Sequence, residues 1–471
     1  MEAVLCQGCL EKEARIADLE RRVAELERRN RQLAELVRQH LGELPPPPTT
    51  PARAAPEFTR PLPKKKSGKK RGGQQGHPPR LKQLLPPERV DLVVPFRPTR
   101  CDACGAALPE DAQPDDPAPT RHQCAELPPV RATITEYQGH FRTCNCGHVQ
   151  HAAIPAALKA ESVGPQLAAL LSYLVGVHHV SKRGVEEIVE DVLGVPISLG
   201  KVSALEQEMS AALQAPFEEA VAEVRAAPVK HVDETGWKLA GVKRWLWAAA
   251  TKSVAVFLIH ARRNLTALGL LLGERIIGIV HSDRWRVYNA IPVTQRQLCW
   301  AHLRRNFEKK LEQGAEAKAL AEVFLAIHDA VFQRWHLFRG GGCSREELAD
   351  NMEPLAIAMH AMLSEGQAHG DEKTVRLCTA LLQLEPALWT FVTEEGVEPT
   401  NNHGERVQRQ AVLWRKCCFG CQSERGCRFV ERLLTVVQTL RLQKRSVLSY
   451  LTEAIQAYRA GHQAPKLVAV G

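Results

Sequence analysis

The feature of this sequence that most constrains its fold is a pair of β-prone segments that each lead into an aspartate. Residues 229–233 end in Asp233, and residues 244–250 and 254–260 are two further runs rich in β-branched and aromatic side chains. Because only a short polar turn separates these two runs, we expect an antiparallel meander. Later in the chain, the continuous apolar run 276–280 leads into Asp283. This order predicts a mixed domain built around one sheet.

The two aspartates are candidate metal ligands. A sheet that carries carboxylates at the ends of neighbouring strands can hold a hard divalent cation between them. Either aspartate alone is more typical of a turn or a helix cap. On one sheet, Asp233 and Asp283 together predict a metal site.

A third carboxylate, Glu405, stands at the start of a predicted helix. Three basic residues follow on the same helix: Arg409, Arg415 and Lys416. Asn402 and Glu405 also have the spacing of a capping box, which would explain the glutamate without a catalytic role. Because two aspartates precede it on a sheet of ribonuclease-H-like order, Glu405 is a candidate third member of the metal site.

A basic helix is predicted after the second aspartate. Residues 297–300 read as a short strand, and the helix that follows carries His302, Arg304 and Arg305. These three residues are candidate DNA contacts, because a basic helix beside a metal site suits a substrate with a phosphate backbone. Solvated charges on a surface helix would give the same pattern.

Two regions show helical periodicity. Residues 158–213 include a helix at 183–193, a turn at Gly194, and a second helix that Ser198 can cap. A helix, a short turn and a capped helix have the form of a helix-turn-helix unit, and a plain helical connector is the alternative. Residues 315–395 are expected to be an all-helical insertion without a catalytic constellation.

Residues 10–41 form a predicted coiled-coil helix. Four residues fall at one apolar seam position and three leucines at the other: Ile16, Val23, Asn30 and Val37, with Leu19, Leu26 and Leu33. β-Branched residues at one position, leucine at the other and one asparagine favour a parallel two-stranded coiled coil. This pattern predicts a homo-oligomer, and a helix packed on its own domain is the alternative.

A Pro-rich linker and a basic arm follow the coiled coil. The arm contains a run of cations without an acid among them: Lys64, Lys65, Lys66, Lys69, Lys70 and Arg71. Such a segment binds a polyanion when it has a partner and is a solvated linker when it has none. We expect it to contact the backbone of a nucleic acid, which positions the protein without specifying a sequence.

Two cysteine pairs predict a structural zinc site. Cys101 and Cys104 open a segment that Cys144 and Cys146 close, which is the layout of a zinc ribbon with four thiolates. The second pair is one residue tighter than the usual spacing, so other residues could substitute as ligands: Cys124, His148 or His151. The sequence has 14 cysteines and no recognisable export signal, and this combination favours reduced thiols over disulfides. Incidental buried cysteines are the alternative.

As a set, these features resemble the insertion-sequence-66 transposases of the DDE superfamily. The resemblance covers most of the chain and rests on the coiled coil, the arm, the cysteine region and several short motifs: Gly72-Gly-Gln-Gln-Gly-His77, His231-Val-Asp233-Glu-Thr, Ser282-Asp283 with Tyr288-Asn289, Cys299-Trp-Ala-His302-Leu-Arg304-Arg305, Asn401-Asn402-His-Gly-Glu405-Arg406, Arg415-Lys416 and Ser423-Glu-Arg-Gly426.

The resemblance implies a ribonuclease-H-like catalytic fold with a helical insertion between the second Asp and the Glu. It also implies DNA transposition by a multimer on the element's ends. Asp233, Asp283 and Glu405 would hold two Mg²⁺ or Mn²⁺ ions on one phosphodiester, where such ions activate the nucleophile and stabilise the leaving oxygen. Glu234 would point to the opposite face of its strand and is not assigned a metal. Whether element-encoded accessory proteins take part stays open.

Two other functions fit the same features. A DNA-binding regulator with an inactive catalytic domain would keep the coiled coil, the zinc unit and the arm, although three intact acids argue against decay. A hydrolytic nuclease of the same fold would cleave DNA without joining a 3′-hydroxyl to a target. Cys299 and His302 could also form a further metal site with three cysteines: Cys417, Cys418 and Cys421.

These patterns divide the 471 residues into eight segments: a coiled coil (1–44), a Pro-rich and basic arm (45–98), a zinc-binding domain (99–153), a helical unit (154–216), the first catalytic part (217–310), the helical insertion (311–396), the last catalytic part (397–445) and a C-terminal tail (446–471). The net charge of +9 is modest but unevenly distributed. Without a secretory signal or an apolar run near the roughly twenty residues of a membrane span, a cytoplasmic protein with no membrane partner is expected.

Overall fold

The computed structural model describes residues 84–468, except 112, 129, 369 and 370, together with Arg21 and Arg28. The predicted coiled coil and the basic residues of the arm therefore lie outside the described residues, apart from those two arginines. Both stay predictions.

The described chain forms two compact units. The smaller contains residues 84–134 and 192–194, with η1 (Pro87–Arg89) as a short 3-10 helix. The larger contains residues 135–191 and 195–468. The three candidate acids all lie in the larger unit.

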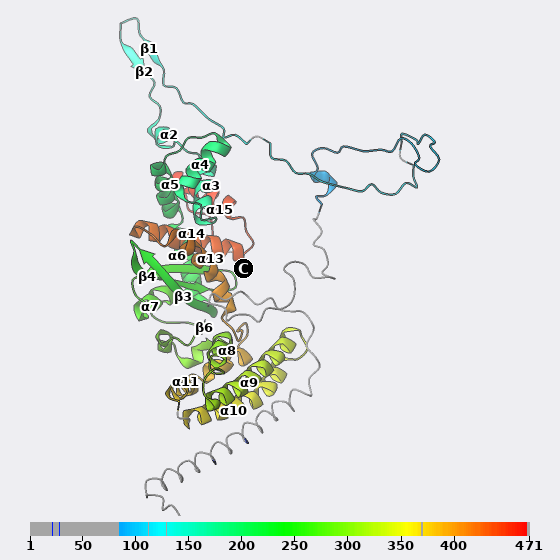
Figure 1. Ribbon diagram of the computed structural model, residues 1–471. Helices are drawn as coiled ribbons and strands as arrows, with labels where there is room; N and C mark the ends of the chain where they lie inside the picture. Colours follow the sequence, from blue (N-terminus) through cyan, green and yellow to red (C-terminus); the bar gives the residue numbers. More distant parts are fainter. Residues whose placement is uncertain are drawn as a thin grey trace, which may run out of the picture. The chain divides into compact units, whose positions relative to one another are not determined.

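A five-stranded sheet organises the larger unit (Figure 1). In chain order its strands are β3 (Val229–Leu239), β4 (Val242–Ala250), β5 (Ala255–His260), β6 (Ile279–Ser282) and β7 (Arg296–Leu298). In space the order is β5-β4-β3-β6-β7. The β3–β4 and β4–β5 pairs are antiparallel, and the β3–β6 and β6–β7 pairs are parallel. The predicted antiparallel meander is thus confirmed. A strand does precede Asp283, but it covers Ile279–Ser282 rather than 276–280, and Gly278 before it has a φ of 70°.

The prediction that the first strand ends at Asp233 is wrong, because β3 continues to Leu239. The added residues pair with β4, and the turn at Ala240 and Gly241 closes the hairpin with φ values of 47° and 78°. A two-residue turn with both φ angles positive matches the twist of the flanking strands. Parallel pairing with β6 stops at His231, which faces His281. Asp233 therefore lies mid-strand, just beyond the part that β6 covers.

The outer edge of β5 is bonded to a helix. Alternate main-chain N–H groups of β5 donate to side chains spaced four residues apart on α14 (Glu424–Leu442): Ala255 to Thr439 (3.0 Å), Phe257 to Thr435 (3.0 Å) and Ile259 to Glu431 (2.6 Å). Two strand residues span about 6.6 Å and four helical residues about 6.0 Å, so the two series stay in step. The helix closes an edge that another strand could otherwise pair with.

Helices precede and follow the sheet. A short hairpin of β1 (Phe141–Thr143) and β2 (Val149–His151) comes first, and five helices follow it: α2 (Ala156–Ala160), α3 (Pro165–Gly176), α4 (Lys182–Leu193), α5 (Leu199–Ala212) and α6 (Gln214–Ala226). Between β5 and β6 lies α7 (Leu265–Leu272), and between β6 and β7 lie η2 (Arg286–Ala290) and η3 (Val293–Gln295).

The two helices of the predicted helix-turn-helix form where expected. Gly194 has a φ of 67° in the turn, and the Ser198 side chain accepts from the main-chain N–H of Lys201 at the start of α5. However, α3, α14 and α15 contact α5, and only Gly200 and Ala204 of this helix are exposed. The second helix therefore packs within the larger unit, and its entry into a DNA groove stays a prediction.

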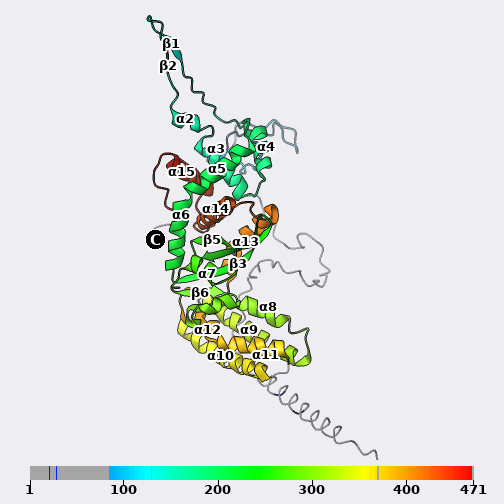
Figure 2. The same ribbon diagram turned by 90° about the vertical axis from the view of Figure 1, so that its left-hand side faces the viewer.

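The described residues between 315 and 395 are helical, as predicted. After α8 (Trp300–Glu308), four helices complete the block before the chain returns to the sheet: α9 (Ala315–Arg339), α10 (Arg345–Ala368), α11 (Glu372–Gln383) and α12 (Pro386–Thr393). Phe307 and Phe324 stack at 3.9 Å between ring centroids in its core, and Trp300 Nε1 donates to Leu388 O at 2.8 Å. Figures 1 and 2 show this block beside β6. The core of the insertion is therefore continuous with the helix that follows β7.

Part of the predicted C-terminal tail is a packed helix. α15 (Val447–Arg459) contacts α3 and α5, and Arg459 pairs with Glu208 at 2.7 Å. Residues 447–459 thus belong to the core of the larger unit. Among the helices of the described residues, none combines the length and hydropathy needed to cross a bilayer.

Candidate active site

Asp233 and Asp283 occupy matching positions on neighbouring segments of the sheet. His231 and His281 are the last residues at which β3 pairs with β6, and each aspartate follows two positions later in its segment. Residues two apart on a strand point to the same face, and adjacent strands lie about 4.8 Å apart. Asp283 Oδ1 accepts from the main-chain N–H of Trp285 at 2.8 Å, which fixes this carboxylate just after β6.

Glu405 joins these aspartates from the first turn of α13 (Asn402–Cys418), the helix that packs on β3 and β4. Its Oε1 lies 3.4 Å from Nη2 of Arg305 and 3.4 Å from Nδ1 of His302. The N-cap residue is Asn401, and it makes no side-chain capping bond. The capping box that would pair Asn402 with Glu405 is therefore wrong, because Asn402 is the first residue of the helix and not its N-cap.

The electrostatics of Asp233 reflect the convergence of the acids. Burial raises the pKa of its carboxyl well above the usual range, and the negative charges of Glu234, Glu405 and Asp283 raise it further. Carboxylates held this closely repel one another unless a proton or a cation lies among them. All three sequence-predicted acids thus share one electrostatic environment.

The amide of Asn401 fastens the start of α13 to β3. Its Oδ1 lies 3.0 Å from Nδ1 of His231, and its Nδ2 donates to the carbonyl of Val232 at 2.8 Å. Asn401 is buried, so these bonds are made away from water. They fix where the helix begins and hence where Glu405 stands relative to Asp233.

Gln408 is a neighbour of Asp233 that the sequence analysis missed. In the amide orientation that satisfies both of its polar atoms, its nitrogen donates to Asp233 Oδ2 and its oxygen accepts from the main-chain N–H of Thr235 at 2.8 Å. Gln408 follows Glu405 by three residues and lies on the same helical face. The three-residue spacing from Glu405 was the available signal that Gln408 lies near the acids. It becomes informative only once α13 is known to pack on β3.

Gly404 allows the close contact between α13 and β3. A Cβ at this position would lie 2.9 Å from Oδ1 of Asn401 and 3.2 Å from Cβ of His231. Both neighbours are held in place, one by hydrogen bonds and the other on the strand. A glycine therefore lets the helix approach the sheet one residue before Glu405.

Glu234 points to the opposite face of the sheet, as strand alternation predicts. Its carboxylate accepts from the Tyr288 hydroxyl and from Nε of Arg263 at 2.7 Å. The Arg263 guanidinium lies 3.7 Å from the ring centre of Trp285 and 4.9 Å from that of Trp245. This carboxylate is already neutralised within a packed network, which supports leaving it out of the metal site.

The predicted basic contacts separate into two groups. Arg304 bonds to Glu308 (2.9 Å) and Asp329 (2.5 Å), and Arg415 bonds to Thr235 (2.8 Å). These two arginines connect elements within the larger unit. By contrast, Arg409 and Lys416 are exposed on α13, and Arg406, which the sequence analysis did not single out, is exposed on the same helix.

Each of the two cysteine pairs lies in a tight turn, one in each unit. Each turn has two main-chain hydrogen bonds and a glycine with positive φ: Cys101 N to Ala106 O (2.9 Å), Gly105 N (φ 74°) to Cys101 O (2.8 Å), Cys144 N to His148 O (2.7 Å), and Gly147 N (φ 84°) to Cys144 O (2.8 Å). Main-chain N–H groups, chiefly those of Cys104 and Cys146, lower the pKa of Cys101 and Cys144. Each turn by itself favours a thiolate.

A second group of metal-ligand types lies at the start of α8. Cys299, His302 and Glu405 each offer one ligand atom, and these atoms lie within 4.8 Å of one another. The sequence suggested a site of Cys299 and His302 with Cys417, Cys418 and Cys421, of which the first two end α13 and the third follows it. In the structure Cys421 lies against Cys427, and Cys299 and His302 lie beside the carboxylate of Glu405.

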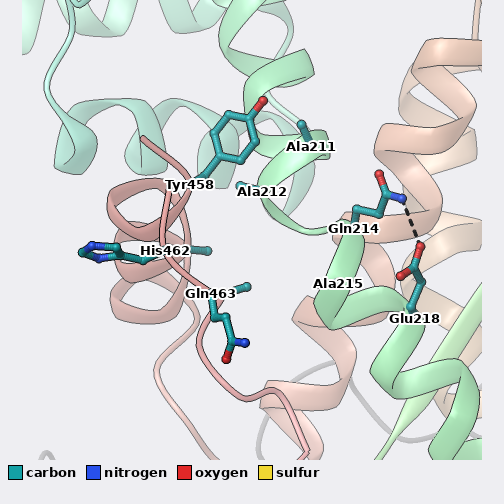
Figure 3. Close-up of a pocket in the computed structure, with 10 residues that line it drawn as sticks. Ala211, Ala212, Gln214, Ala215, Glu218, Tyr458, His462 and Gln463 are labelled. Carbon is teal, nitrogen blue, oxygen red and sulfur yellow. Dashed lines mark hydrogen bonds between the residues drawn. The ribbon is translucent and has the colours of Figure 1, made fainter. Parts of the chain in front are cut away.

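A cavity of about 340 Å³ lies between α5, α6 and the segment that follows α15 (Figure 3). Alanines form much of its lining, together with Tyr458 and a Gln214–Glu218 hydrogen bond of 3.0 Å. The lining residues include none of the three acids. The candidate active site is therefore a separate place on the larger unit.

The sequence model of the transposase IS66 family matches residues 161–428, which is more than half of the 471 residues and spans all three acids. This match identifies the class of the protein as a transposase. In particular, the chain belongs to the IS66 family of transposases.

A curated relative is an uncharacterised protein, y4qI, of Sinorhizobium fredii (strain NBRC 101917 / NGR234). The two sequences are 28% identical over 179 residues, which cover 36% of this chain and 32% of the relative. The chain thus matches about a third of the length of that relative, whose description states no activity.

Proposed function

We propose that Asp233, Asp283 and Glu405 are the catalytic acids of a DNA transposase that cleaves strands at the element's ends and joins them to a target. The observation that carries this proposal is the convergence of three carboxylates from β3, from the end of β6 and from the first turn of α13. The raised pKa of Asp233, to which the charges of the other two acids contribute, supports their proximity.

The donor set fits two magnesium ions, or manganese in their place. All three side chains offer hard carboxylate oxygens, which these cations prefer. Burial raises the pKa of Asp233 most, and the neighbouring carboxylates raise it further; a divalent cation would relieve that repulsion. When bound, the ions would activate the attacking hydroxyl and stabilise the leaving oxygen.

The protein's own residues hold the acids in position. Gln408 donates to Asp233, Asn401 bonds to β3, and Trp285 donates its main-chain N–H to Asp283. Each acid therefore has a neighbour that limits its movement. Such preorganisation lowers the barrier because the carboxylates need not rearrange as charge develops.

The exposed cations of α13 support a DNA path that begins at the acids. Arg406, Arg409 and Lys416 follow Glu405 on the helix, and side chains at this spacing share one face. Phosphate contacts of this kind supply affinity and orientation. The basic arm and the coiled coil, outside the described residues, would add phosphate contacts and a homo-oligomeric assembly.

The domain that carries these acids is proposed to be ribonuclease-H-like. Three antiparallel strands continue into two parallel ones, and the first acid is on the central strand. The helical block between β7 and α13 would then be the insertion. We also propose that Cys101, Cys104, Cys144 and Cys146 bind a structural zinc ion, to be tested by zinc content of the purified protein and of serine variants.

The deciding experiment is Mg²⁺-dependent cleavage of DNA that carries the element's own ends. Wild type should cleave, and Asp233→Asn and Glu405→Gln should lose cleavage while still binding the DNA. Joined products would distinguish a transposase from a hydrolytic nuclease. Cleavage that survives in Glu405→Gln would contradict the site, and binding without cleavage in wild type would favour a regulator.

A further inference from the structure

Cys299, His302 and Glu405 combine a thiol, an imidazole and a carboxylate at one point. Cys299 is the N-cap residue of α8 and is buried, whereas the His302 and Glu405 side chains are 30% and 34% exposed. His302 is three residues from Cys299 and comes back over it in the first turn of the helix. The group is thus formed by α8 and closed by the first turn of α13.

The spacing of these atoms is close to that of a tetrahedral zinc site. Ligand atoms that bind zinc at its usual bond lengths lie about 3.3–3.7 Å from one another. His302 Nδ1 and Glu405 Oε1 are 3.4 Å apart, and Cys299 Sγ completes a triangle with no side longer than 4.8 Å. Movement of the sulfur by about 1 Å would bring all three onto one ion.

One contact of the sulfur fits a metal-bound thiolate. The main-chain N–H of Asn401 donates to Cys299 Sγ at 3.2 Å, and sulfurs that bind metals commonly accept such bonds. A thiolate and a carboxylate together would neutralise a divalent cation. The partial exposure of His302 and Glu405 leaves room for water as a fourth ligand.

Two features oppose a cation here. Burial raises the pKa of the Cys299 thiol to about 11, so a bound ion has to displace the thiol proton. Arg305 Nη2 lies 3.4 Å from the same oxygen of Glu405 and would have to move aside. The Arg305 side chain is 25% exposed and also donates to the carbonyl of Ala301. Arg305 can therefore keep its hydrogen bond to Ala301 when an ion binds the carboxylate of Glu405.

We propose that Cys299, His302 and Glu405 form a binding site for one thiophilic divalent cation such as Zn²⁺, separate from the magnesium ions of the catalytic site. Binding releases the thiol proton to solvent as the sulfur becomes a ligand. Because an ion held here competes with the magnesium ions for the carboxylate of Glu405, it withdraws the third acid. This inhibitory consequence rests on the proposed function, whereas the binding site itself does not.

The test uses Co²⁺ as a spectroscopic substitute for Zn²⁺ on the full-length protein with its other zinc sites already filled. Wild type should take up one further equivalent and show thiolate-to-cobalt charge-transfer absorption. Cys299→Ala should lose both the band and the equivalent. Cys378→Ala removes an equally buried thiol of α11 and should keep them.

Two partly exposed ligands give a second test if Cys299→Ala does not fold. His302→Gln and Glu405→Gln keep the sulfur, so the charge-transfer band should persist while the affinity for Co²⁺ falls at least about tenfold. Equal cobalt uptake and equal spectra in wild type and the folded variants would overturn the proposal.

Activity measurements then address the inhibitory consequence. At fixed Mg²⁺, Zn²⁺ should inhibit wild-type cleavage, and Cys299→Ala should need at least about tenfold more Zn²⁺ for the same fractional inhibition relative to its own zinc-free rate. Equal sensitivity would refute the link to Glu405. Absence of cleavage in every protein would contradict the proposed function instead, and the cobalt difference would still decide the metal site.

Discussion

The imidazole rings of His231 and His281 stack with centroids 4.0 Å apart and an interplanar angle of 13°, two residues before each aspartate. His403 approaches His231 from α13 at 5.1 Å. Burial is the main cause that lowers the pKa of each of the three histidines, and that of His281 falls to about 4. Three neutral imidazole rings therefore pack together beside the strand residues that precede the two aspartates.

Acid should destabilise the protein through these rings. A histidine in the unfolded chain has a pKa of about 6.5, so the neutral ring of His281 contributes stability above that pH, and this contribution disappears as the pH falls toward 4. The shift corresponds to about 3 kcal/mol. The raised pKa of Asp233 acts in the opposite sense, because its contribution is present at low pH and lost as pH rises through that pKa.

Urea unfolding of wild type and His281→Gln between about pH 7 and 4.5 isolates the histidine. The stability advantage of wild type should shrink as the pH falls. His462→Gln replaces an exposed histidine and should show no such convergence. A constant difference for His281→Gln across this range would contradict the assignment.

Asn401→Ala should weaken both the fold and the site. The substitution leaves the buried His231 ring and Val232 carbonyl without this partner, which costs about 1–3 kcal/mol. Cleavage should fall more than DNA binding, because the start of α13 sets the position of Glu405. Asn402→Ala, at the exposed neighbouring position, is the control. Equal behaviour of the two variants in unfolding and cleavage assays would rule out a positioning role for Asn401.

Gly404→Ala should also separate α13 from β3. Alanine favours a helix by about 0.5–1 kcal/mol over glycine, but overpacking typically costs about 1–3 kcal/mol. Because the new Cβ would lie 2.9 Å from Asn401 Oδ1, the clash should prevail and stability should drop. Gly269→Ala in α7 meets nothing within 4 Å and should stabilise instead. Thermal unfolding of both variants checks the signs, and a stabilised Gly404→Ala would disprove the close approach.

Arg409→Ala should lower DNA affinity uniformly across sequences. One lost phosphate contact should reduce the slope of log affinity against log salt by about 0.9. Arg304→Ala should leave that slope unchanged and instead reduce stability, because Arg304 bonds to Glu308 and Asp329. Binding isotherms at several salt concentrations distinguish the two. An unchanged slope for Arg409→Ala would remove this residue from the DNA path.

Much of this architecture follows from local pattern. The runs 244–250 and 254–260 form strands because β-branched and aromatic side chains suit a half-buried sheet, and α5 begins after Ser198 because a serine oxygen satisfies a free N–H there. The full length of β3 was not predictable in this way. Thr235 and Gly236 are ordinary turn residues, and only pairing with β4 keeps them extended.

The support of the site depends on contacts between distant segments. Gln408 and Asn401 have polar side chains that suit a surface helix equally well, and their bonds to β3 exist only after α13 packs on the sheet. Charge has the same ambiguity. Arg304 and Arg409 look alike in sequence, yet one bonds within the protein and the other is exposed.

The hydrogen bonds between β5 and α14 allow amide exchange in the strand to report when the helix detaches from it. The N–H groups of Ala255, Phe257 and Ile259 are bonded to side chains rather than to another strand. Their exchange with deuterated solvent therefore requires α14 to leave the edge, without any strand separating from its neighbour. Deuterium uptake at these three amides measures the free energy of that local opening, and amides in β3 measure the opening of the sheet itself.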